Sequence, residues 1–202
     1  MDLKSGYREE NSVDMNTENL IEREELAQLK KINDINNFTE KQFGDLVICT
    51  ANESHIKEIA ELWANLATVQ QMFAPERYNY SAEDKNWRIF VAKKLSKTNN
   101  LLLVAKNKGE YEIKGFLYLQ TITIPSSDLV LKAVIEDIYT KPQYRKQNIG
   151  SMMLDVAIDW AKKHNIKQID LITSLQIKDL SEFYSKVVKK ISSGINLELQ
   201  IL

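Results

Sequence analysis

Three strand-like segments follow one another directly, and a helix-like segment joins them to a fourth. Residues 101–105, 115–124 and 129–140 are rich in Leu, Ile, Val, Phe and Tyr and are separated by short connections, so they predict an antiparallel meander. Residues 149–163 have the apolar spacing of an amphipathic helix, and residues 168–173 read as a strand. A strand–helix–strand unit requires a parallel pair with a right-handed crossover. The sequence therefore predicts a mixed sheet, an α/β fold of the α+β type, with helices on both faces.

The flanking segments complete the order of elements. Residues 46–49 predict a short strand, and residues 53–67 and 87–95 predict two helices. A further helix is expected at residues 180–187, and the alternating segment 195–202 predicts a closing strand. The expected order is β-α-α-β-β-β-α-β-α-β.

The first 43 residues differ in composition from the remainder of the chain. They are rich in Asn, Glu and Lys, and only residues 17–32 carry a loose apolar stripe. A chain of 202 residues is long enough for one domain and a tail. We expect residues 1–43 to be an N-terminal extension, partly helical or disordered, and residues 44–202 to form one domain.

Composition excludes several classes of protein. The 27 basic and 28 acidic residues nearly cancel, leaving a net charge of -1, which argues against bulk electrostatic binding of nucleic acid or an anionic membrane. No apolar run approaches the roughly 20 residues of a membrane span, and the N-terminus lacks the apolar region of a secretory signal. The single cysteine, Cys49, forms no internal disulfide, and no Cys/His spacing indicates a metal. A cytoplasmic, metal-free protein is expected.

The junction between the strand at 129–140 and the helix at 149–163 carries the most specific chemistry. A short basic loop with Arg145 and Lys146 leads directly into a helix that begins near Gly150. Free backbone N–H groups and the positive end of the helix dipole make such a junction a phosphate site. Its spacing fits neither a P-loop nor the dinucleotide-binding glycine pattern.

The segment YRKQNIGSMML at this junction resembles the acyl-CoA-binding motif of the GNAT superfamily of N-acyltransferases. The family pattern is Arg or Gln, two residues, Gly, one residue, then Gly or Ala. The preceding IEDIYTKPQ is similar to the family's fourth strand, and Phe183-Tyr184 resembles its aromatic pair. The resemblance spans roughly residues 46–186.

The chain departs from the family pattern at three places. Asn148 occupies the position of the first Gly, which Asn tolerates best among other residues if a positive φ is needed. Ile177 stands where many members have an Asn that touches the cofactor. Val188-Lys189 replaces the usual Gly-Phe.

The resemblance implies a site for acetyl-CoA as acyl donor, in a V-shaped opening between the family's fourth and fifth strands. The pantetheine arm would pair with backbone groups of the strand, and a backbone N–H near Ile138 would polarise the thioester carbonyl. The pyrophosphate would bind the loop and the helix start. The implied cofactor residues are Ile138, Tyr139, Thr140, Arg145, Lys146, Gln147, Asn148, Ile149, Gly150 and Ser151.

Two residues are candidates for catalysis. Glu136 lies where many family members place a Glu and could accept a proton from the amine, directly or through water; the alternative is an edge carboxylate paired with a Lys. Tyr184 could protonate the departing thiolate; the alternative is a core residue. Asp137 should point to the opposite face from Glu136 if the strand is regular, which favours a structural or substrate-orienting role.

The resemblance favours an N-acetyltransferase that moves the acetyl group to a primary amine by direct attack, because no Ser/His/Asp or Cys/His set indicates a covalent intermediate. The acceptor could be a small amine or a peptide amine, and a homodimer is possible. Trp63, Tyr78, Tyr80 and Trp87 could line an acceptor pocket, although core packing or loop anchoring is the simpler interpretation of the two tryptophans. The alternative function is a non-catalytic acyl-CoA-binding module of the same fold.

Overall fold

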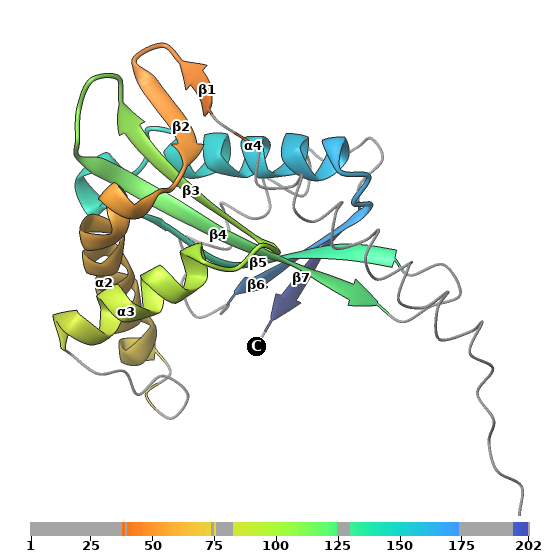
Figure 1. The fold of residues 1–202 in the computed structure, drawn as a ribbon, viewed down its shortest axis with the longest axis horizontal. Coiled ribbons are helices and arrows are strands. Elements are labelled where there is room, and N and C mark those ends of the chain that lie inside the picture. The colour runs from red at the N-terminus through yellow and green to blue at the C-terminus, as the bar shows by residue number, and fades with distance from the viewer. Residues whose placement is uncertain are drawn as a thin grey trace, which may run out of the picture. The chain divides into compact units, whose positions relative to one another are not determined.

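The computed structural model describes residues 38, 40–73, 75, 83–124, 130–173 and 196–201, which belong to one compact unit. The described strands form one sheet in the order β1 to β7 (Figure 1). They are β1 (Glu40–Phe43), β2 (Leu46–Thr50), β3 (Asn100–Asn107), β4 (Ile113–Ile124), β5 (Val130–Thr140), β6 (Gln168–Thr173) and β7 (Asn196–Ile201). The described helices are α2 (Ile56–Phe73), α3 (Asp84–Leu95) and α4 (Ile149–Lys163), with short 3-10 turns η1 (Glu53–His55) and η2 (Pro142–Tyr144). None of these helices is both long enough and apolar enough to span a membrane.

The strand pairing confirms the predicted topology. Strands β3, β4 and β5 form the antiparallel meander. Strand β5 pairs with β6 in parallel, as predicted for segments 129–140 and 168–173. Strand β7 is the predicted closing strand and runs parallel to β6. The helix expected at residues 180–187 lies outside the described residues.

The sheet begins before the predicted domain boundary. Residues 40–43 form β1, which pairs antiparallel with β2, although the sequence pattern assigned them to the N-terminal extension. Gly44 has φ +60 in the tight turn between the two strands, a conformation that glycine adopts without steric cost. The sheet therefore starts at Glu40, and the assignment of the preceding residues to an extension stays a prediction.

Helices cover both faces of the sheet, as the fold class requires. Helices α2 and α3 pack on one face and α4 packs on the other (Figure 1). On β3, Leu102 and Val104 belong to the core cluster under α2 and α3, whereas the intervening Leu101, Leu103 and Ala105 are fully buried outside that cluster. This alternation follows from the two-residue period of a strand. The inner strands are therefore apolar on both faces.

Candidate active site

Strands β5 and β6 separate after a short paired stretch. Their register joins residues 132–135 to residues 168–171, and a buried ion pair between Lys132 and Asp170 lies within this stretch. Strand β5 continues to Thr140, paired with β4 on its other side. Among the described residues no strand pairs with residues 136–140 on the side of β6. Within the described part of the chain this half of β5 therefore has an unpaired edge, as expected for the V-shaped opening that the family resemblance implied.

A β-bulge interrupts β5 where the open edge begins. Tyr118 of β4 lies opposite Asp137, but the next residue, Leu119, lies opposite Ile135. Glu136 is therefore the extra residue. A bulge shifts the alternation of side chains by one position, so Glu136 and Asp137 both contact residues on the face covered by α2 and α3. The expectation that Asp137 points away from Glu136 is wrong, because it assumed a regular strand.

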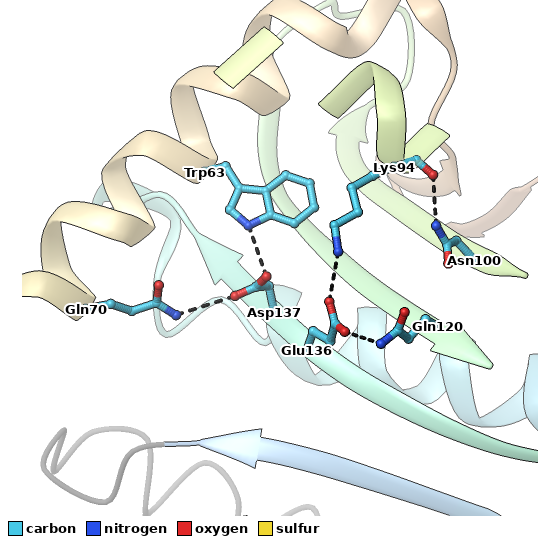
Figure 2. A network of polar contacts seen from close by, with 7 residues as sticks. All are labelled: Trp63, Gln70, Lys94, Asn100, Gln120, Glu136 and Asp137. Carbon is cyan, nitrogen blue, oxygen red and sulfur yellow. Dashed lines mark hydrogen bonds and ion pairs between the residues drawn. The ribbon is translucent and has the colours of Figure 1, made fainter. Parts of the chain in front are cut away.

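Glu136 is held by two neighbours. The Lys94 Nζ atom on α3 lies 3.0 Å from Glu136 Oε2, and the Gln120 side chain on β4 donates a hydrogen bond to Glu136 Oε1. Figure 2 shows the three side chains pointing toward one another. Lys94 also lies over the ring of Tyr118, 4.2 Å from its centroid. The alternative interpretation of Glu136, a carboxylate paired with a Lys, matches this geometry. Its role as a base stays a prediction.

Asp137 is held from α2. Trp63 Nε1 donates to Asp137 Oδ2 at 3.0 Å, and Gln70 Nε2 donates to Asp137 Oδ1 at 3.4 Å (Figure 2). Burial raises the pKa of the Asp137 carboxyl above its usual range, while the hydrogen bond from Trp63 acts in the opposite direction. The cause is the loss of hydration, which disfavours the charged form. Asp137 is thus a half-buried acid whose two described hydrogen-bond donors are neutral.

A cavity of about 230 Å³ lies beside Asp137. It is lined by Trp63, Ala67, Gln70, Asn86, Trp87, Phe90 and Asp137. Asn86 and Phe90 are exposed to solvent, so the cavity is accessible from that side. Trp63 and Trp87 are buried, at 3% and 8% exposure, yet both reach its wall. Trp63 and Trp87 therefore pack in the core and also line the cavity.

The loop after β5 brings the predicted phosphate-binding residues together. Lys146 and Asn148 have φ values of 62 and 61, in the left-handed region that Asn adopts more readily than most residues. Asn148 therefore has the positive φ at which Asn can take the place of the Gly in the family pattern. Asn148 is the N-cap of α4, no side chain caps the helix, and its first turn contains no acidic residue. The first backbone N–H groups of α4 are thus free of side-chain caps.

The side chains around this loop differ in exposure. Arg145, Lys146, Gln147 and Asn148 are exposed, Gly150 and Ser151 are half-buried, and Ile149 is buried. The Arg145 Nε atom donates to the carbonyl oxygen of Thr140 at 3.3 Å, which anchors the loop to the end of β5. The Tyr139 side chain packs in the core against Phe116. Only the backbone of Tyr139 faces the open edge.

Some predicted residues cannot be located. Tyr184 and the departures at Ile177 and Val188-Lys189 lie outside the described residues, as do Tyr78 and Tyr80. Sequence reasoning missed Gln70 and Asn86 and undervalued Asp137. The available signal was the pair of adjacent acids in an apolar strand: two neighbouring charges are costly to bury on opposite faces of a covered sheet, which indicates a bulge.

Comparison with known proteins agrees with this geometry. The family model for the acetyltransferase (GNAT) family matches residues 61–187. A stretch of 51 residues, 25% of the chain, is 39% identical to the uncharacterized N-acetyltransferase YhdJ of Bacillus subtilis (strain 168) and spans 36% of that relative. The matched stretch thus covers about a third of that protein.

Solved structures share the fold. A transcriptional regulator from Bacillus halodurans C-125 superposes with a TM-score of 0.59 at 26% identity, covering 73% of this chain and 94% of the other. The aminoglycoside acetyltransferase meta-AAC0020 from an uncultured soil metagenomic sample, in complex with trehalose, gives a TM-score of 0.58 at 18% identity, covering 78% and 97%. The second likeness supports the fold alone. Because the family model spans more than half of the residues and includes both β5 and α4, the chain belongs to the GNAT family of acetyltransferases.

Proposed function

We propose that the protein transfers an acetyl group from acetyl-CoA to a primary amine by direct attack of the amine. The observation that carries this proposal is the end of the pairing between β5 and β6 beside a bulge that turns two carboxylates to one face of the sheet, where one of them, Asp137, lines an open cavity. A donor site on the open strand edge and an acceptor site on the adjacent face would meet at residues 136–138.

The residues of the junction fit an acyl-CoA. Left-handed backbone at Lys146 and Asn148, an uncapped helix start and two exposed basic side chains suit a pyrophosphate. We propose that residues 145–151 hold it and that the backbone of Ile138, Tyr139 and Thr140 pairs with the pantetheine arm. Bound acetyl-CoA would supply the acetyl group as an activated thioester.

Side chains of the protein would then carry out the two proton transfers of the reaction. A primary alkylamine is almost wholly protonated at neutral pH, so the ammonium must lose a proton before its nitrogen forms the C–N bond. We propose that a carboxylate on β5 accepts that proton directly or through water. Glu136 is paired with the Lys94 ammonium, whereas Asp137 receives neutral donors and is the one carboxylate among the described residues that line the cavity, which supports Asp137 over Glu136. As the C–S bond breaks, Tyr184 is proposed to protonate the leaving thiolate.

The donor site is tested by calorimetry of CoA binding. Gly150→Asp adds a negative charge at the start of α4 and should weaken CoA binding roughly tenfold or more, because the carboxylate meets the pyrophosphate. The matched control is Asn165→Asp, which adds the same charge just beyond the other end of α4 and should leave affinity unchanged. Equal affinities in both variants and in the wild type would contradict the placement.

The reaction is tested by thiol release from acetyl-CoA across a panel of small amines and peptides. Tyr184→Phe should lower kcat roughly 10- to 1000-fold, the range of general acid catalysis, with CoA affinity retained. Asp137→Asn should lower kcat more than Glu136→Gln does. If the wild type binds CoA but acetylates no amine, the non-catalytic acyl-CoA-binding module replaces this proposal.

A further inference from the structure

We propose that the cavity between α2, α3 and β5 selects compact alkylamines that carry a single positive charge, holding the ammonium group with Asp137 and the rings of Trp63, Trp87 and Phe90. This inference rests on the proposed function, because it names the acceptor class of the same site. It goes further in excluding amino acids and polycations as preferred acceptors.

The carboxylate of Asp137 has capacity for a cation. Each oxygen receives one described hydrogen bond, from Trp63 at 3.0 Å and from Gln70 at 3.4 Å. An ionised carboxylate offers about four acceptor positions, so an ammonium group can add its own hydrogen bonds. Both existing donors are neutral. The negative charge of Asp137 is therefore compensated by no cation in direct contact among the described residues that line the cavity.

Three aromatic rings surround the same space. The rings of Trp63 and Trp87 stand nearly perpendicular to that of Phe90, at 86° and 82°, with centroids 5.0 Å and 5.8 Å from it. Aromatic faces attract cations through the ring quadrupole, most strongly for Trp and after loss of water. Two buried tryptophan rings and the exposed ring of Phe90 around a half-buried carboxylate thus form an environment for an organic cation, and the rings also accommodate its alkyl chain.

The protein already holds an alkylammonium beside this cavity. The Lys94 Nζ atom lies 3.0 Å from Glu136 Oε2, 4.2 Å from the Tyr118 ring centroid and 5.3 Å from that of Phe90. One carboxylate of the bulge and two rings therefore hold a primary ammonium group. Asp137, the other carboxylate of the bulge, offers the same kind of contacts and shares Phe90. The surroundings of the Lys94 ammonium thus resemble those that we propose for the ammonium group of the acceptor.

Size and charge narrow the class of acceptor. A cavity of about 230 Å³ is below the range of roughly 300–1,000 Å³ typical of sites for drug-sized ligands. Its described lining contains one carboxylate, two amides and no basic side chain. Among the described residues that line the cavity, a second ammonium would meet no second acid, and a carboxylate on the ligand would meet Asp137 and no basic side chain. A short, singly charged alkylamine satisfies all of these groups.

The test measures binding without acetyl-CoA, so it does not depend on acetyl transfer. Calorimetry at pH 8 compares n-butylamine, 1,4-diaminobutane and 4-aminobutyrate, which share a four-carbon chain and differ at its far end. All three carry a protonated amine at this pH. We expect n-butylamine to bind most tightly and 4-aminobutyrate at least roughly tenfold more weakly, because its carboxylate is repelled and unpaired. Equal or tighter binding of 4-aminobutyrate or 1,4-diaminobutane would overturn the proposal.

Two variants locate the binding. Asp137→Asn keeps an acceptor for Trp63 but removes the charge, and should weaken n-butylamine binding roughly 10- to 100-fold, as expected for hydrogen bonds to a charged group. Phe90→Leu changes a half-exposed ring and should weaken it roughly 3- to 10-fold through lost cation–π attraction. The matched controls are Asp159→Asn and Tyr111→Leu, an exposed acid and an exposed ring far from the cavity in sequence. Circular dichroism checks that each variant folds.

The two proposals fail in different ways. If n-butylamine binds as expected but no amine triggers thiol release, the acceptor pocket stands and the acetyl-transfer proposal fails. If thiol release occurs but Asp137→Asn and Phe90→Leu, both folded, bind n-butylamine like the wild type, acetyl transfer stands and the pocket assignment is overturned.

Discussion

The two halves of β5 differ in their strand partners, and this difference separates the core from the candidate site. The first half, residues 130–135, pairs with β4, and its residues 132–135 also pair with β6. The second half, residues 136–140, keeps β4 but lacks a described partner on the other side, and it starts with a bulge. Strand pairing on both sides stabilises a sheet, whereas an open edge leaves backbone groups available to a ligand. One strand thus belongs to the core in its first half and to the candidate site in its second.

The largest difference in stability is expected between two single-residue deletions, one of the bulge residue Glu136 and one of Val134 in the regular part of β5. Removing Glu136 takes out the extra residue and leaves a regular ladder, so the fold should persist. Removing Val134 either reverses the facing of residues 130–133 or closes the bulge and turns the Glu136 carboxylate to the buried opposite face. Either outcome should lower the melting temperature far more than the removal of Glu136 does. Circular dichroism with thermal melting distinguishes the two variants.

The Glu136 deletion leaves Lys94 without its carboxylate, so Lys94→Met is combined with it as a control for that loss. A melting temperature for the Val134 deletion equal to or above that of the Glu136 deletion in the Lys94→Met background would contradict this placement of the bulge.

The ion pair in the first half of β5 should contribute more to the free energy of unfolding than an exposed ion pair does. Lys132 and Asp170 have side-chain exposures of 13% and 2%. Lys132→Met leaves a buried carboxylate without its cation and should lower the free energy of unfolding by about 3–5 kcal/mol. Urea titration measures this loss. Adding Asp170→Leu should restore much of it, and failure of the double variant to recover would assign the loss to packing.

The buried acid of the second half should respond to pH. Burial raises the folded-state pKa of Asp137, so its ionisation costs stability. That cost is complete above the folded pKa and absent below the unfolded value of about 3.9. Asp137→Asn should therefore raise the free energy of unfolding at pH 8, and the gain should shrink as the pH falls toward 4. Urea titrations at several pH values check this, with Asp159→Asn as the exposed control. A gain independent of pH would contradict the assignment.

The smallest effect is expected just beyond the end of β5. The Lys141 Nζ atom lies 2.9 Å from Glu112 Oε1, and the Glu112 side chain is 44% exposed. Solvent screens such a pair, so Lys141→Met should cost at most about 1 kcal/mol. The same urea titration compares it directly with Lys132→Met. Equal losses would mean that burial does not distinguish the two ends of the strand.

Much of the fold was predictable from local patterns. Alternating apolar residues indicated the meander, and the strand–helix–strand unit required the parallel pair of β5 and β6. The basic loop, Asn148 and Gly150 indicated a helix start suited to phosphate. The meander, the parallel pair and the helix start are confirmed because they depend on near neighbours in the chain, whose spacing directly sets periodicity, capping and turn geometry. Phosphate binding at that helix start stays a prediction.

The candidate acceptor site was less predictable. Trp63, Gln70 and Phe90 lie far from Asp137 in sequence, and nothing local indicates that they share a cavity. The family resemblance favoured Glu136 as the base, and the assumption of a regular strand placed Asp137 on the opposite face, although the pair of adjacent acids was a local sign of the bulge. Pairing between β4 and β5 creates that bulge, and it involves residues of two strands at once.

By itself the sequence determined the order of elements from β2 to β6, the mixed sheet and the backbone junction of β5 with α4, since these follow from local periodicity and turn chemistry. Only the tertiary structure decided where β5 leaves β6, which carboxylate is held by Lys94 and which one lines the cavity. Those outcomes depend on register, burial and long-range contacts, which set the hydration and the neighbours of a charge. The partners and the hydration of Glu136 and Asp137 are therefore set by tertiary packing rather than by their positions in the sequence.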